Sequence, residues 1–152
     1  ERQLPVTVAR IFNTVGPRQT GRYGMVLPRF VEAAKAGEPL RVFGDGQQSR
    51  CFCHVSDTVE ALLHLAKCDR APGGVFNIGG TEEVSILNLA KRVIELTVST
   101  SKIELVPYAE AYDSGFEDMQ RRKPVVDKLE AFTGFRPATP LDEIVRSTAD
   151  LA

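Results

Sequence analysis

The chain contains several short apolar runs of the kind that form strands. Residues 6–12 are β-branched and mostly apolar, without alternation of apolar and polar positions, which is typical of a strand covered on both faces in a parallel sheet. Gly44, Asp45 and Gly46 separate two further runs, and this spacing predicts a hairpin-like turn between them. The other predicted strands are residues 40–43, 51–55, 75–78 and 102–106.

Other segments carry apolar side chains at the three- and four-residue spacing of a helix face. One helix is expected from about Met25 to a stop at Gly37, and another after Ser85, a favourable N-cap residue. Asp57 and Glu60 have the spacing of a capping box, which predicts the start of a helix with one apolar stripe. That stripe consists of Val59, Leu62, Leu63 and Ala66. The last two helices are expected at residues 126–132 and from Thr139 and Pro140 onward.

The order of these elements indicates the fold class. Alternating strands and helices predict an α/β fold, but the strands are too few and too unevenly spaced for a complete doubly wound sheet. The first residues already form a predicted central strand, with no preceding partner and no device against edge pairing. We therefore expect that an upstream part of the fold is missing.

Composition and charge argue against several classes of protein. Apolar residues make up 43% of the 152, which is enough for one ordinary domain with a core. The 19 lysines and arginines nearly balance 20 aspartates and glutamates, so the chain lacks the broad basic field that attracts nucleic acid or an anionic membrane. No run approaches the roughly 20 apolar residues that span a bilayer, and the first residues lack the layout of a signal peptide. We expect a cytoplasmic protein with reduced cysteines.

Four blocks of sequence, taken in order, resemble one enzyme family. They are ARIFNTVGPRQ at residues 9–19, GEPLRVFGDGQQSRCFCHVSD at 37–57, VFNIGG and QRRKP. The first resembles a family strand and loop that ends in Asn-x-x-Gly-Pro, and the second a Gly-Asp-Gly-x-x-x-Arg block followed by Val-x-Asp. The family is the extended short-chain dehydrogenase/reductases that act as nucleotide-sugar epimerases, dehydratases and decarboxylases. The wording GPRQTGRYGMVLPRF is most similar to UDP-sugar 4-epimerases.

This resemblance implies a fold and a cofactor. The chain would be the C-terminal, substrate-binding part of an extended Rossmann-type, NAD(P)-binding enzyme, without the N-terminal Rossmann core. Residues 1–24 would form the last Rossmann-type strand and a substrate loop, and residues 25–152 the substrate-binding α/β subdomain. The complete enzyme would use NAD and a UDP-sugar.

The resemblance also implies a substrate site. A UDP-sugar needs arginine forks for its two phosphates and a flat apolar slot for its base. Asn13, Arg50 and Arg122 match family residues that contact the phosphates, so the two guanidinium groups are expected within about 10 Å of each other. The base slot would consist of Leu27, Phe30, Val42 and Phe43. Without the resemblance, these residues are equally a turn asparagine, two surface arginines and ordinary core residues.

Two motifs of the family do not occur in this sequence. No G-x-G-x-x-G turn lies at a strand-to-helix junction, and no tyrosine begins a Tyr-x-x-x-Lys pair. We therefore expect no catalytic residue here, and we expect that the isolated chain neither binds NAD nor turns over substrate. Its partner would be the missing N-terminal Rossmann half, and the apolar first strand predicts association with another copy when that half is absent.

Several alternatives remain open. Cys51 and Cys53 share one face of a predicted strand, and His64 and Cys68 lie one helical turn apart, so together they could form a zinc site. Asp57 is a helix cap more readily than a catalytic acid, and no nucleophile elbow supports a hydrolase.

Within the family, the sequence does not distinguish a 4-epimerase from a UDP-glucuronate decarboxylase or a 4,6-dehydratase. Val125 stands where decarboxylase-like relatives have an acidic residue, and outside the family the alternative is a binding module without activity.

Overall fold

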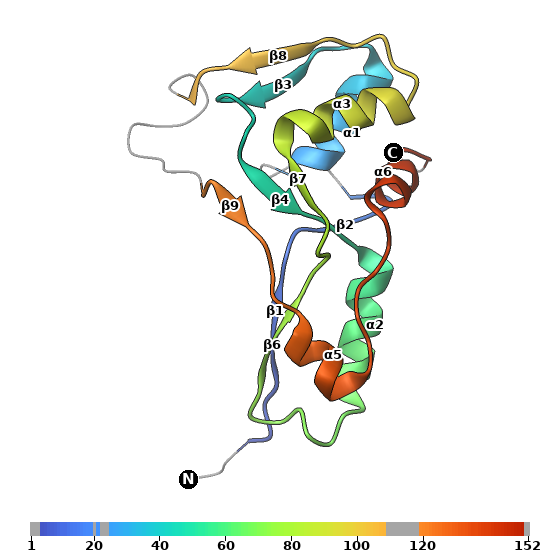
Figure 1. Ribbon diagram of the computed structural model, residues 1–152. Coiled ribbons are helices and arrows are strands. Elements are labelled where there is room, and N and C mark those ends of the chain that lie inside the picture. Colours follow the sequence, from blue (N-terminus) through green and yellow to red (C-terminus); the bar gives the residue numbers. More distant parts are fainter. Residues whose placement is uncertain (1–3, 20, 22–24, 109–118, 151–152) are drawn as a thin grey trace.

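A computed structural model describes residues 4–19, 21, 25–108 and 119–150 of the chain (Figure 1). The fold is α/β and elongated, with an upper and a lower part in this view. The strands are β1 (Val8–Ile11), β2 (Thr14–Val15), β3 (Leu40–Phe43), β4 (Ser49–Cys51), β5 (Cys53–His54), β6 (Val75–Ile78), β7 (Glu83–Ser85), β8 (Ile103–Val106) and β9 (Arg121–Arg122). The helices are α1 (Val26–Ala36), α2 (Val55–Ala66), α3 (Ile86–Leu96), α5 (Asp127–Thr133) and α6 (Leu141–Asp150).

The described strands pair in small sheets. Parallel pairs join β1 to β6, β2 to β5 and β3 to β8, while β4 lies between β7 and β9. The predicted hairpin of residues 40–43 with residues 51–55 is therefore wrong. Gly44 and Gly46, both with φ of 70°, turn the chain away from β3 into a different sheet, and β3 pairs instead with the distant β8.

The upper part has its core between α1, α3, α6 and the β3–β8 pair. Helix α1 buries the face that its spacing predicts, and it ends at Gly37, whose left-handed φ of 71° allows its N–H to reach the carbonyls of Ala33 and Ala34. Helix α3 begins as predicted, because the Ser85 hydroxyl accepts a hydrogen bond of 3.2 Å from the Asn88 N–H. Local sequence rules are thus confirmed for both helices.

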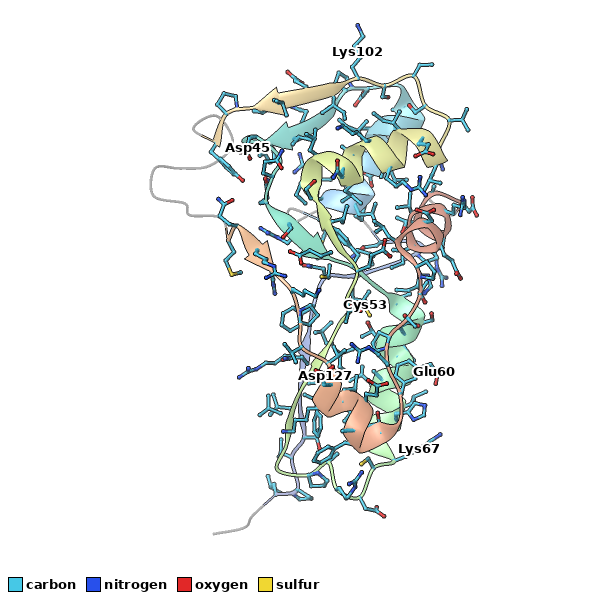
Figure 2. All side chains as sticks on the ribbon, viewed as in Figure 1. Asp45, Cys53, Glu60, Lys67, Lys102 and Asp127 are labelled. Carbon is cyan, nitrogen blue, oxygen red and sulfur yellow. The ribbon has the colours of Figure 1, made fainter. Side chains whose placement is uncertain are left out.

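The lower part is a second cluster, in which α2 and α5 pack with β1 and β6. Its centre is Phe76, whose ring meets that of Phe132 edge-on at 5.2 Å between centroids. Figure 2 shows Cys53 at the junction of the two parts. Segments far apart in the sequence form each part, and the boundary near residue 24 stays a prediction.

The start of α2 differs from the prediction. Its N-cap is His54, whose side chain accepts from the Ser56 N–H at 3.2 Å, so the capping box of Asp57 and Glu60 is wrong. Asp57 lies in the first turn and accepts from the N–H groups of Ala138 and Thr139 at 3.2 and 3.0 Å. Asp57 therefore fastens the segment before α6.

An apolar surface on α2 and β1 is uncovered within the described chain. The predicted apolar stripe of α2 is not its buried face, because Leu62 and Leu63 are 38% and 47% exposed. The buried face of α2 consists of Thr58, Ala61 and Leu65. The parallel pairing of β1 is confirmed, but its expected cover on both faces is not, since Val8 and Ile11 are 46% and 47% exposed. Among the described residues, no helix has the length and apolar character that crossing a membrane requires.

Candidate functional site

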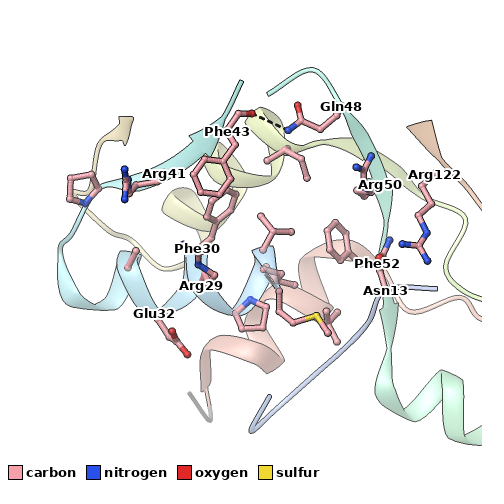
Figure 3. A pocket seen from close by; sticks show the side chains of 18 of the residues that line it. Asn13, Arg29, Phe30, Glu32, Arg41, Phe43, Gln48, Arg50, Phe52 and Arg122 are labelled. Atoms are coloured by element: carbon pink, nitrogen blue, oxygen red, sulfur yellow. Dashed lines mark hydrogen bonds between the residues drawn. The ribbon is translucent and has the colours of Figure 1, made fainter. Parts of the chain in front are cut away.

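A cavity of about 580 Å³ lies in the upper part, beside α1, β3, β4 and β9 (Figure 3). Its volume is in the range of sites for small molecules. Four arginines and two glutamates are among its described lining residues, so cationic side chains are in excess. The cavity therefore suits an anionic ligand with an apolar portion.

Asn13, Arg50 and Arg122 lie together at one end of the cavity (Figure 3). Arg50 and Arg122 are direct partners in the parallel pairing of β4 with β9, and neighbouring strands lie about 4.8 Å apart. Side chains opposite each other project to the same face of the sheet, which directs both guanidinium groups to this end. The structure thus brings together three residues that the sequence separates widely.

Local contacts hold these three side chains. The Arg122 guanidinium lies over the Phe12 ring, 5.4 Å from its centroid, and Arg50 Nη1 donates to the Ser49 carbonyl at 2.7 Å. Asn13 Nδ2 donates to the Cys51 carbonyl at 2.8 Å, which uses one of its two hydrogens. The polar end is therefore formed largely before any ligand arrives.

The opposite part of the cavity carries aromatic side chains beside charged ones. Leu27 and Phe30 from α1 line it together with Phe43 at the end of β3. The Arg29 guanidinium lies 5.8 Å from the centroid of the Phe43 ring. Leu27 and Phe30 are themselves buried, so Phe43 offers the accessible aromatic surface on which a planar group can stack.

Val42 does not line the cavity. Its side chain is fully buried in the upper core, because successive side chains of a strand point to opposite faces and Phe43 takes the cavity side. One edge of the β3 backbone is paired with β8. The structure therefore does not place Val42 where the resemblance implied.

The sequence reasoning missed some lining residues, notably Gln48 and Tyr108. Gln48 is buried, and its Nε2 donates to the Phe43 carbonyl at 3.0 Å, which fixes the end of β3. Tyr108 follows β8 and lies so close to the turn that a Cβ added to Gly44 would be 2.2 Å from its Cε2. The position of Tyr108 depends on the pairing of β3 with β8, so it could not be predicted without that pairing.

The cysteines do not form a metal site. Burial raises the pKa of the Cys51 and Cys53 thiols above their usual range, which keeps both protonated. Cys68 Sγ contacts the Phe132 carbonyl at 3.3 Å, and His64 stacks on Phe135. Nowhere in the described part of the chain do three His, Cys, Asp or Glu side chains meet as metal ligands, so the zinc alternative is wrong.

The glycine pair after β6 does not fit the phosphates of NAD. A Cβ added to Gly79 would lie 2.8 Å from Phe12 Cβ, and one added to Gly80 would lie 2.0 Å from the Phe52 carbonyl oxygen. These glycines make room for neighbouring parts of the chain. A dinucleotide needs a glycine turn that opens onto a helix N-terminus, whereas the chain continues here into β7.

Comparisons with known proteins point to one family. The model of the NAD dependent epimerase/dehydratase family matches residues 1–79. A UDP-N-acetyl-alpha-D-glucosaminuronate decarboxylase of Bacillus cytotoxicus is 44% identical over 95% of the chain, which spans 45% of that protein. UDP-glucuronic acid decarboxylase 4 of Arabidopsis thaliana is 41% identical over 91% of the chain, which spans 29% of it. The structure of a UDP-glucose 4-epimerase of Thermotoga maritima, solved with UDP-glucose, matches with a TM-score of 0.82 at 31% identity. The match covers 95% of this chain and 45% of the epimerase chain.

Proposed function

Because the chain belongs to the NAD dependent epimerase/dehydratase family, we propose that it is the nucleotide-sugar-binding part of an enzyme that acts on a UDP-sugar. One observation carries the proposal: the register of β4 and β9 sets Arg50 opposite Arg122 at the polar end of the cavity. Two guanidinium forks side by side match a diphosphate, to which each can give paired charge-assisted hydrogen bonds.

Each part of the cavity has a role in this proposal. The diphosphate lies at Arg50 and Arg122, and the second Nδ2 hydrogen of Asn13 donates to it. The uracil lies in the slot between Phe30 and Phe43. Remote binding of the nucleotide then orients the sugar for reaction, which is how binding energy away from the reacting atoms raises a rate.

The proposed sugar carries a carboxylate. The curated relatives compared above are decarboxylases whose names specify UDP-linked uronic acids, at 44% and 41% identity, and these support a decarboxylase of that kind. A UDP-sugar 4-epimerase is the second candidate, which the likeness to the Thermotoga maritima enzyme and the wording of residues 16–30 favour. NAD is the cofactor of the proposed enzyme, and the described residues of this chain are not the part that holds it.

UDP is expected to bind the chain, whereas NAD is not. The cavity offers the groups that a pyrimidine diphosphate needs, and the chain lacks the glycine turn that cradles a dinucleotide. Isothermal titration with UDP, UDP-glucuronate and NAD measures the three affinities, with circular dichroism to show that the chain is folded. NAD binding at micromolar affinity, or no binding of UDP by folded protein, would contradict the expectation.

The chain on its own is expected to associate with a second copy. The outer edge of β1 and the apolar surface of α2 are uncovered among the described residues, and such an edge pairs readily with another strand. Light scattering should show dimers at high concentration for the wild type and for the control Val98→Lys, whose site is an exposed turn. Val8→Lys should shift the chain toward monomer. A strictly monomeric wild type would count against association through this surface.

A further inference from the structure

Strand β9 is short, yet it carries one of the two arginines at the polar end of the cavity. It consists of Arg121 and Arg122 alone, paired in parallel with Ser49 and Arg50 of β4. A hydrogen bond of 2.8 Å from the Ser49 N–H to the Gln120 carbonyl supports the pairing. A two-residue strand has few backbone bonds, so its position depends on its side chains.

The two arginines of β9 project to opposite faces, because side chains alternate along a strand. Arg122 faces the cavity, while Arg121 lies on the other face beside Ser49. On that face the Glu83 carboxylate of β7 accepts two hydrogen bonds from Arg121, from Nε at 2.7 Å and from Nη2 at 2.8 Å. The Ser49 hydroxyl donates to the same carboxylate at 2.6 Å. One carboxylate therefore links all three strands of the sheet.

We propose that Glu83 is a positioning residue that, through Arg121, holds β9 against β4 and so sets Arg122 beside Arg50. The proposal rests on the proposed function, in which Arg122 binds the substrate diphosphate. Glu83 itself does not line the cavity, so it acts on the ligand only through the strand that it fixes.

An exposed ion pair usually contributes little to global stability, and Arg121 is an exposed residue. The expected effect is therefore local. Glu83 accepts three hydrogen bonds with good geometry, and Lys123 Nζ lies 3.9 Å from the same carboxylate. These contacts add to the short pairing of β9 with β4 and to the contact of Arg122 with Phe12.

The charge state of Glu83 suits this role. Hydrogen bonds from Arg121 and Ser49 lower the pKa of Glu83 from 4.5 to about 2. The stabilisation that a carboxylate with a lowered pKa gives is fully present at pH values above its ordinary pKa. It is lost as the pH falls through the lowered pKa. The link is thus intact at neutral pH and is lost only as the pH falls from about 4.5 toward about 2.

Glu83→Gln tests the proposal with UDP as the probe, because it removes the charge while keeping the size of the side chain. We expect E83Q to weaken UDP binding about fivefold, with an unchanged melting temperature, since only the placement of a charge-assisted contact is lost. Hydrogen exchange at residues 119–124 should quicken, while exchange in β3 and β8 should not change. Glu130→Gln is the control. Glu130 lies on α5, away from the cavity, and accepts a hydrogen bond of 2.6 Å from the exposed Arg136. E130Q should therefore bind UDP like the wild type.

A double-mutant cycle separates positioning from a general structural effect. If Glu83 acts through Arg122, the double variant E83Q/R122A should bind UDP no more weakly than R122A. Unchanged binding by E83Q, alongside weakened binding by R122A, would overturn the positioning role and leave the proposed function standing. Losses that multiply in the double variant would also overturn it. Unchanged binding by R122A would overturn the proposed function and this inference with it. Arg121→Gln removes the other partner of the link and decides the question in the same way if E83Q does not fold.

Discussion

Replacing Arg50 by alanine is expected to weaken UDP binding by about tenfold or more. A bidentate, charge-assisted bond from a guanidinium to phosphate contributes roughly 1.5–3 kcal/mol in a partly desolvated site, and about 1.4 kcal/mol corresponds to tenfold in affinity. Arg122→Ala should have a similar effect, because its guanidinium lies at the same end of the cavity. Arg50→Lys should recover only part of the loss, since an ammonium group cannot form the paired bonds. Isothermal titration with UDP measures each affinity.

A matched control for these two substitutions is Arg70→Ala. Arg70 also lies over a phenylalanine ring, that of Phe132 at 5.0 Å, and also donates to backbone carbonyls, but it belongs to the lower part of the molecule. R70A should bind UDP like the wild type. In the proposed enzyme, R50A should raise KM for the UDP-sugar more than it changes kcat, as expected for a contact made equally in the ground state and transition state. If R50A and R70A bind UDP equally well, the diphosphate does not lie at Arg50.

Helices whose ends and faces follow local rules could be predicted from the sequence. Helix α1 has its apolar face and its glycine stop within one continuous segment. Ser85 caps α3 by accepting a hydrogen bond from the N–H of Asn88, three residues later. Such interactions depend on neighbouring residues, so the pattern alone is sufficient. The parallel arrangement of β1 was also predictable, because its continuous apolar composition is typical of parallel sheets.

Contacts between distant segments could not be predicted in the same way. The partner of β3 is β8 rather than the next strand along the chain, and no local signal distinguishes the two choices. The apolar stripe of α2 was correctly recognised as apolar, but its residues are uncovered because the described chain supplies only one side of that helix with a packing partner. A periodic pattern shows that a face is apolar and does not show what covers it.

The candidate site was predicted in part, and by a motif rather than by spacing. Arg50 and Arg122 each lie within a family block, whereas their separation in the sequence gives no reason for them to meet. The β4–β9 register supplies that reason. Glu83 could not have been found, because its role depends on two strand pairings that no short segment encodes.

Gly80→Ala is expected to lower the free energy of unfolding by about 3 kcal/mol, at the upper end of the cost of overpacking a close contact. A Cβ at this position would lie 2.0 Å from the carbonyl oxygen of Phe52 and 3.0 Å from its carbonyl carbon. Both are backbone atoms, so rotation of a side chain cannot relieve the clash. For a chain of this length the melting temperature should fall by roughly 6–12 °C, which differential scanning calorimetry measures.

The same substitution should also weaken UDP binding, because Phe52 lines the cavity and must move with its own backbone. Gly73→Ala is the matched control: Gly73 has a φ of 81°, and a Cβ there would have no neighbour within 4 Å. Its cost is limited to the left-handed backbone, about 1 kcal/mol, and UDP binding should not change. G80A and G73A with equal melting temperatures would show that β6 and the β4–β5 bend do not approach this closely. A large loss of stability in G80A with unchanged UDP affinity would show that Phe52 does not shape the ligand site.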